Sequence, residues 1–173
     1  MDGKKKKSVW LAVSIASLIY LIVGLGESPC VTRTENRTVR GNSMSGLIEM
    51  GRNIKILYDY YNCNPVQRGD IVAYGYRGNP NTIVKMVRGM PGDSFSTENN
   101  RLNINGQPVT NSNNQPYSLD EETGKMLALY VKDYQGKIPS DTYLILGNIT
   151  HGSLDSTCFG LVGKNDIIGK VIY

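Results

Sequence analysis

Histidine is almost absent from this chain: His151 is the only one among 173 residues. One imidazole cannot complete the usual ligand sets of a zinc site, and the three cysteines form no Cys-x-x-Cys pair. We therefore expect no metal and no cofactor. Cys30, Cys63 and Cys158 lie far apart, so the spacing leaves open whether any two of them form a disulfide. If two do, one thiol stays free.

Outside the N-terminus, basic and acidic side chains are nearly equal in number. The formal net charge is +4, but without residues 1–7, which include the run Lys4–Lys7, the chain carries 15 basic and 14 acidic side chains. The basic pI therefore reflects a charged N-terminal tail. We expect no nucleic acid among the partners of this protein.

A single long uncharged run follows the basic tail. Residues 8–26, SVWLAVSIASLIYLIVGLG, contain no charged side chain. A helix of this length spans about 28 Å, close to a bilayer core of about 30 Å. The run is long for a cleavable signal peptide, and no good small-x-small cleavage site follows it. We predict an uncleaved transmembrane anchor, with residues 1–7 in the cytoplasm and the rest of the chain outside the cytoplasmic membrane.

Phenylalanine is also scarce, with 2 residues, whereas tyrosine and glycine number 11 and 19. This bias favours strands and turns over helices. After a polar linker at residues 27–37, strand-forming segments follow one another through residues 38–173, so we expect an all-β domain of antiparallel sheets. The predicted strands lie in TVRGNSM (38–44), NIKILYDYY (53–61), GDIVAYGY (69–76), NTIVKMVRGMPGD (81–93), RLNINGQPV (101–109), TYLILG (142–147) and DIIGKVIY (166–173).

Two features inside this domain bear on local structure. The pair Asn105-Gly106, between alternating apolar residues, predicts a β-hairpin. Residues 119–131, LDEETGKMLALYV, have helical character, but Gly124 interrupts the pattern. This stretch is therefore either a helix or a strand that ends in LALYV.

Three short fragments contain candidate functional residues. Ser43 lies in GNSMSG, where a serine beside glycine and asparagine normally reflects turn chemistry. Lys85 lies in TIVKMVRG with apolar neighbours on both sides. It is either a lysine at a sheet edge or a desolvated lysine whose lowered pKa lets the neutral amine act as a base. The third fragment, GNITHGSLDSTCFG, places Ser153 and Asp155 in a polar loop after an apolar strand.

In this order, and behind an N-terminal anchor, the fragments resemble signal peptidase I, the membrane-bound serine/lysine protease that removes signal peptides. The resemblance covers residues 39–171. GNSM resembles the nucleophile motif, IVKMVRGMPGD the lysine motif, and LNINGQPV the hairpin that follows. GNITHGSLDSTCFG matches the last motif in length, and IIGKV also matches. A lysine rather than a histidine at the base position is typical of the bacterial members.

The resemblance implies a role for each matching residue. Ser43 would attack the scissile carbonyl group, and neutral Lys85 would take its proton, so no histidine is needed. Ser153 would hold the lysine amine by a hydrogen bond, and Asp155 would be the structural aspartate. Gly41 falls in the oxyanion loop, at a position where some members carry a hydroxyl that adds a second donor.

The chain departs from the family pattern at four places. Gly46 replaces a proline, Met86 and Thr157 replace two arginines, and GNI at residues 147–149 replaces Gly-Asp-Asn. In the family both arginines can pair with the structural aspartate. Asp155 therefore loses both expected partners, and a buried unpaired carboxylate would be costly.

The resemblance implies the function of signal peptidase I, a serine endopeptidase that cleaves signal peptides from secreted preproteins after small residues. Its partners would be these preproteins and membrane lipid. The insert between the lysine motif and the last motif, residues 92–139, leaves room for a hairpin cap but for no large second domain. His151 matches neither the base position nor the helper serine, and we expect it to be a surface loop residue.

Two alternatives stay open from the sequence. One is a specialised peptidase of the same clan that processes a single pilin or conjugation protein. The other is a catalytically inactive membrane-anchored scaffold domain, which the changes around Asp155 suggest. The retained Ser43, Lys85 and Ser153 favour an active enzyme.

Overall fold

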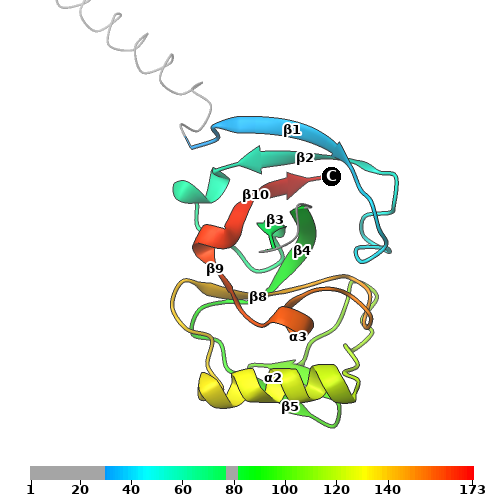
Figure 1. Ribbon diagram of the computed structural model, residues 1–173, viewed down its shortest axis with the longest axis vertical. Helices are drawn as coiled ribbons and strands as arrows, with labels where there is room; N and C mark the ends of the chain where they lie inside the picture. Colours follow the sequence, from blue (N-terminus) through cyan, green and yellow to red (C-terminus); the bar gives the residue numbers. More distant parts are fainter. Residues whose placement is uncertain (1–29, 77–81) are drawn as a thin grey trace, which may run out of the picture.

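The computed structural model describes residues 30–76 and 82–173, which form a seven-stranded antiparallel sheet with a smaller layer beneath it (Figure 1). The predicted tail at residues 1–7 and the predicted anchor at residues 8–26 lie outside the described residues. Within those residues, no helix is both long and apolar enough to cross a bilayer. The sheet has the order β1-β2-β10-β3-β4-β8-β9. Its strands are β1 (Arg33–Thr38), β2 (Asn53–Tyr58), β3 (Ile71–Gly75), β4 (Thr82–Gly89), β8 (Thr142–Leu146), β9 (Val162–Gly163) and β10 (Ile167–Ile172).

The smaller layer comprises the predicted insert. A three-stranded sheet of β5 (Phe95–Glu98), β6 (Arg101–Ile104) and β7 (Gln107–Pro108) packs with helix α2 (Glu121–Asp133) at the lower end of Figure 1. The two parts share one core, because Leu144 and Leu146 of β8 are fully buried against apolar side chains of the insert. The insert is therefore a sheet and a helix built onto β8. Short helices complete the chain: η1 (Tyr60–Asn62), α3 (Ser156–Phe159) and η2 (Lys164–Asp166).

The predicted hairpin is confirmed. Strands β6 and β7 pair with Ile104 opposite Gln107, so Asn105 and Gly106 form a two-residue turn. Both turn residues have positive φ, 51° and 74°. Asparagine and glycine accept this conformation at little cost, which is why this pair fixes the hairpin.

The domain consists mostly of antiparallel sheets, as expected, and helix α2 is an addition to them. The stretch at residues 119–131, left open between helix and strand, forms this helix. Asp120 caps its N-terminus by accepting a hydrogen bond from Thr123 N at 2.8 Å. Lys125 and Glu121, one turn apart, form an ion pair of 2.6 Å. These local signals outweigh the interruption by Gly124, because one glycine costs a helix only about 1 kcal/mol.

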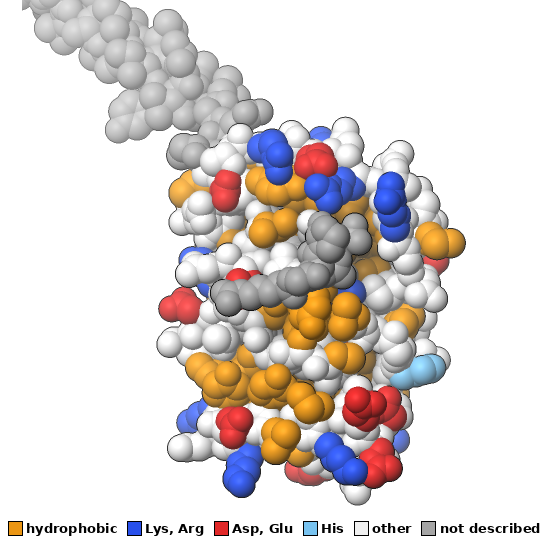
Figure 2. Space-filling view, viewed as in Figure 1, with side chains coloured by type: hydrophobic (Ala, Val, Ile, Leu, Met, Phe, Trp, Pro, Cys, Tyr) orange, Lys and Arg blue, Asp and Glu red, His pale blue; other side chains and the backbone are white. Residues whose placement is uncertain are grey.

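Strand β1 corrects two expectations. Residues 33–37 were predicted to be linker, but Arg33–Thr38 pairs along its whole length with β2. The predicted strand at residues 38–44 instead ends at its first residue. The reason is that β1 is an edge strand with almost no buried side chain, so its sequence lacks apolar alternation and carries the charges that protect sheet edges. Figure 2 shows side chains of both charges at this upper end of the molecule.

The cysteines form one disulfide. Cys30 is bonded to Cys63, and Cys158 is a free, exposed thiol. The bond joins the residue at which the described chain begins to the end of η1. It thereby fixes the start of the domain next to β2.

Candidate active site

Ser43 follows β1 in a hydrogen-bonded turn. The N–H groups of Ser45 and Ile48 donate to the carbonyl oxygens of Asn42 and Met44 at 2.9 and 2.8 Å. Met44 and Ile48 are 2% and 1% exposed and pack into the core below β2. The apolar residues that follow Ser43 therefore anchor the turn, while Ser43 itself stays half-buried at its surface.

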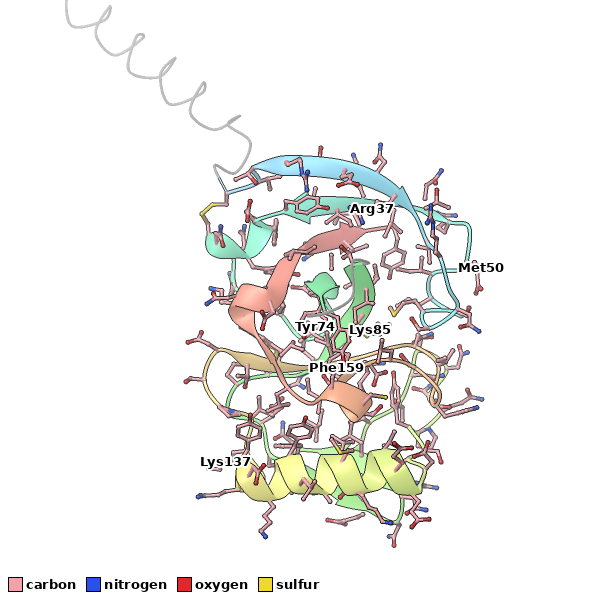
Figure 3. All side chains as sticks on the ribbon, viewed as in Figure 1. Arg37, Met50, Tyr74, Lys85, Lys137 and Phe159 are labelled. Atoms are coloured by element: carbon pink, nitrogen blue, oxygen red, sulfur yellow. A yellow bond between two sulfur atoms is a disulfide. The ribbon has the colours of Figure 1, made fainter. Side chains whose placement is uncertain are left out.

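Lys85 lies in the middle of β4 (Figure 3), opposite Val72 of β3. Strand β8 pairs with β4 only from Met86 onward, so within the described residues Lys85 has no strand partner on that side. Its side chain is buried, with 3% of the residue exposed. The amine contacts Ser43 Oγ at 2.8 Å and Val84 O at 3.1 Å. Two residues that are 42 positions apart in the sequence are thus within hydrogen-bond distance, as a base and a nucleophile must be.

Burial changes the acidity of this lysine. Desolvation lowers the pKa of Lys85 from 10.5 to about 8, and the charge of Asp155 opposes this shift only in part. At pH 7 about one amine in ten is then neutral, compared with about one in a few thousand for an ordinary lysine. The site therefore holds a usable fraction of the free base.

Ser153 lies beside the pair but does not hold the lysine amine here. Its hydroxyl is buried and forms no hydrogen bond within the described part of the chain, so the expected Ser153–Lys85 bond is absent from this arrangement. A Cβ placed on Gly147 would lie 2.4 Å from Ser153 Oγ and 2.7 Å from Ser43 O. Only glycine at position 147 allows these two serines to approach each other so closely.

Asp155 has partners other than the two expected arginines. Its carboxylate is 2% exposed and accepts hydrogen bonds from Gly147 N at 2.9 Å, Thr157 N at 3.0 Å and Thr157 Oγ1 at 2.8 Å. Thr157, at the position of one missing arginine, thus supplies two of the donors. Met86 is buried in the apolar core instead, and Arg88 donates to Thr110 O at 2.7 Å.

Asn148 was not identified as a site residue from the sequence. It is 1% exposed, and its N–H donates to Ser43 O at 2.6 Å. Its side-chain amide bonds to Ser45 O and to Ser112 of the insert. The only sequence signal was the departure of GNI from Gly-Asp-Asn, which does not predict a contact with a turn 103 residues away.

A groove of about 600 Å³ opens beside Ser43 and Lys85. It is lined by residues 37–41, 43–44 and 82–85, and by the buried side chains of Ile54 and Ile56. Gly41, predicted to lie in the oxyanion loop, is in this lining and has a φ of 115°, which strongly favours glycine.

The other polar candidates are peripheral to this groove. His151 is exposed and contacts Thr150 Oγ1 at 3.4 Å. Across residues 30–76 and 82–173, no group of three His, Cys, Asp or Glu side chains is close enough to hold a metal ion.

Comparison with known proteins decides the family. The profile of the family described as "Signal peptidase, peptidase S26" matches residues 11–173. The chain belongs to the signal peptidase S26 family. Signal peptidase IB of Staphylococcus aureus (strain Mu50 / ATCC 700699) is 30% identical over 178 residues, covering 98% of this chain and 90% of that protein. Signal peptidase I of Bacillus caldolyticus is 31% identical over 139 residues, covering 79% and 76% of the two chains.

Among solved structures, the crystal structure of a signal peptidase I from Enterococcus faecalis V583 is similar. It has 25% sequence identity and a TM-score of 0.44, and the alignment covers 62% of this chain and 97% of that one. From its family membership, the present peptidase is a hydrolase of the serine endopeptidase class with signal peptidase function. The family match and the two sequence relatives favour neither the specialised pilin peptidase nor the inactive scaffold.

Proposed function

We propose that this peptidase removes signal peptides from secreted preproteins with Ser43 as nucleophile and Lys85 as general base. The observation that carries the assignment is the 2.8 Å contact between Lys85 Nζ and Ser43 Oγ inside an apolar site. A buried amine of lowered pKa can accept a proton near neutral pH, which an exposed lysine cannot do efficiently.

The reaction would proceed in two steps. Neutral Lys85 takes the hydroxyl proton as Ser43 Oγ bonds to the scissile carbonyl carbon, and the carbonyl oxygen becomes an oxyanion. The lysine then gives this proton to the leaving amine as the C–N bond breaks, leaving an ester on Ser43. A water molecule, deprotonated by the same lysine, attacks the ester, and the proton returns to Ser43 Oγ as the signal peptide leaves with a new carboxylate.

The oxyanion would be met by the backbone N–H of Ser43. Gly41 offers no hydroxyl at the position where some family members have one, so a side-chain donor from that residue is lacking. The positive φ of Gly41 nevertheless sets the course of the chain just before the nucleophile.

The substrate would bind as an extended strand. Residues 86–89 of β4 pair with β8, whereas residues 82–85 pair only with β3 in the described structure. Residues 82–85 line the groove together with residues 37–41. A peptide laid along the other edge of this segment would form main-chain hydrogen bonds with β4 and place its scissile bond beside Ser43. Ile54 and Ile56 give this groove an apolar lining, and the resemblance to signal peptidase I implies small side chains at the cleavage site, as in Ala-x-Ala.

The location proposed for this domain is the outer face of a cytoplasmic membrane, with residues 8–26 as the anchor and residues 1–7 in the cytoplasm. The Cys30–Cys63 disulfide supports this side of the membrane, because such bonds persist in oxidising compartments and are rare in the cytosol.

The test is cleavage of a preprotein by the detergent-solubilised full chain. Ser43→Ala and Lys85→Ala should abolish the formation of mature protein. Ser96→Ala and Lys137→Ala, which change the same residue types outside the groove, should cleave at the wild-type rate. If Ser43→Ala or Lys85→Ala cleaves as fast as the wild type, the assigned pair is wrong.

A further inference from the structure

The side chain of Asn148 is fully engaged in hydrogen bonds. Its Nδ2 donates to Ser45 O at 2.8 Å and to Ser112 Oγ at 2.8 Å, while its Oδ1 accepts from Ser112 N at 3.0 Å. A backbone N–H can only donate and a carbonyl oxygen can only accept, so these partners fix which end of the amide is the oxygen.

These bonds connect three segments that are distant in the sequence. Ser45 is in the turn that carries Ser43, Ser112 is in the insert, and Asn148 follows β8. The backbone N–H groups of Asn148 and Ile149 both donate to Ser43 O, at 2.6 and 3.2 Å. Asn148 therefore binds the turn that carries the nucleophile at two places, at Ser43 through its backbone N–H and at Ser45 through its side chain.

Lys85 approaches the same point from β4. Its strand pairs with β8, with Met86 opposite Leu146, and β8 leads through Gly147 directly into Asn148. The position of the lysine is thus set by the sheet, and the position of Ser43 by the bonds that Asn148 makes to its turn. The 2.8 Å contact between Lys85 Nζ and Ser43 Oγ depends on both.

We propose that Asn148 is a positioning residue for peptide-bond cleavage, acting through the Ser43 turn, and that the insert takes part through Ser112. This inference rests on the function proposed above. An aspartate would have the same size but would bring a carboxylate against Ser45 O and remove the donor to Ser112 Oγ. An amide is needed at this position in this chain, although the family pattern has an acid there.

The decisive variant is Asn148→Asp, assayed on a soluble peptide substrate with kcat and KM measured separately. The matched control is Asn111→Asp. Asn111 is likewise buried, and its Oδ1 accepts bonds from Asn113 N and Gln115 N that a carboxylate would keep. The aspartate would lose only the long bond of 3.3 Å from Asn111 Nδ2 to Gln115 Oε1. A displaced nucleophile slows the chemical step more than it weakens binding, so we expect kcat of Asn148→Asp to fall by about ten- to a hundredfold, with KM changed less than about threefold. Asn111→Asp should keep the wild-type kcat.

A second pair of variants covers the possibility that Asn148→Asp fails to fold. Ser112→Ala removes only a hydroxyl acceptor, and we expect it to lower kcat by about two- to fivefold. In an Asn148→Ala background the same change should have no further effect, since residues in one network are not additive. Thermal melts of every variant give the folded fraction, to which kcat is normalised.

Three results would overturn the inference: a normalised kcat of Asn148→Asp within twofold of the wild type, a loss confined to KM, or additive effects of the two alanine substitutions. Ser43→Ala keeps this result separate from the proposed function. If Ser43→Ala is inactive while Asn148→Asp is fully active, only the role of Asn148 is wrong. If Ser43→Ala cleaves like the wild type, the proposed function itself fails.

Discussion

The Thr157 hydroxyl donates to Asp155 Oδ1 at 2.8 Å, and the backbone N–H of Thr157 donates to the same oxygen at 3.0 Å. A third donor, Gly147 N, meets the other carboxylate oxygen at 2.9 Å. The buried carboxylate is thus stabilised by neutral donors where the family pattern has arginine. This arrangement removes the physical objection to a buried Asp155, because hydrogen bonds to a carboxylate offset much of its desolvation.

The first prediction concerns this hydroxyl. Thr157→Val keeps the shape of the side chain and removes one donor to a buried charge, so we expect the free energy of unfolding to fall by about 1–3 kcal/mol. Urea denaturation at pH 7 measures the change. Thr157→Ser, which retains the hydroxyl, should stay close to the wild type, and equal stability of the valine and serine variants would contradict the role given to this bond.

The second prediction is the pH dependence of cleavage. In the proposed mechanism only neutral Lys85 accepts the proton of Ser43, and burial lowers the pKa of this lysine to about 8. The value of kcat/KM should therefore rise about tenfold per pH unit below this pKa and level off above it. A pH–rate profile on a soluble peptide between pH 6 and 10 measures the midpoint. A flat profile across this range would show that no group of this pKa acts as the base.

The third prediction is that the buried Lys85 lowers the free energy of unfolding. Its pKa is about 8 in the folded protein and near 10.5 in an ordinary environment. Between these two pKa values the unfolded chain binds more protons than the folded protein, so the free energy of unfolding rises with pH. Below pH 8 the buried lysine is charged, and its full cost to the free energy of unfolding is present. Lys85→Met should therefore be inactive yet more stable than the wild type at pH 7, by up to about 3 kcal/mol. Urea denaturation at pH 7 and pH 10 tests this, since the advantage should shrink at the higher pH.

The sequence was informative where one residue type suffices for a local structure. Asn105 and Gly106 predict their hairpin because few residues accept positive φ, and Lys85 was recognised as out of place among apolar neighbours. The pairing of Ser43 with Lys85 came from the resemblance to a family, and the structure brings the two side chains together.

Strand β1, the partners of Asp155 and the role of Asn148 could not be predicted, because they depend on contacts between segments that are distant in the sequence. Strand β1 is read as linker because an exposed edge strand has no apolar period. The partners of Asp155 include the backbone N–H of Gly147, and a pattern of side chains in the sequence cannot predict a backbone donor. The role of Asn148 is visible only in the folded structure, where its side chain bonds to both Ser45 and Ser112.

The fourth prediction concerns the disulfide between Cys30 and Cys63. These residues are 33 positions apart, and closing a loop of this length restricts the unfolded chain enough to stabilise the fold by about 3–4 kcal/mol. Adding a reductant should lower the midpoint of thermal unfolding by the same amount as the double substitution to serine. Cys158→Ser is the control, because that thiol is free. An unchanged midpoint under reducing conditions would contradict the bond.

The last prediction concerns Gly46, where the family pattern has proline. Its φ is 83°, whereas proline fixes φ near −65°, and its N–H donates to Glu49 Oε1 at 2.8 Å. A Cβ would also lie 3.2 Å from Asn148 Nδ2. Gly46→Pro, although it restores the family residue, should therefore cost about 2 kcal/mol or more and displace the turn that carries Ser43.

Two measurements separate this effect from a general sensitivity to losing glycine. Gly124→Ala lies in helix α2, where its Cβ would meet Leu119 at an ordinary 3.8 Å. It should raise stability by about 0.5–1 kcal/mol. Gly46→Pro should lower both the unfolding free energy and kcat, the latter even in the folded fraction, because the turn and the Asn148 amide move together. If the proline variant is as stable and as active as the wild type, the turn does not require the backbone conformation that only glycine adopts readily.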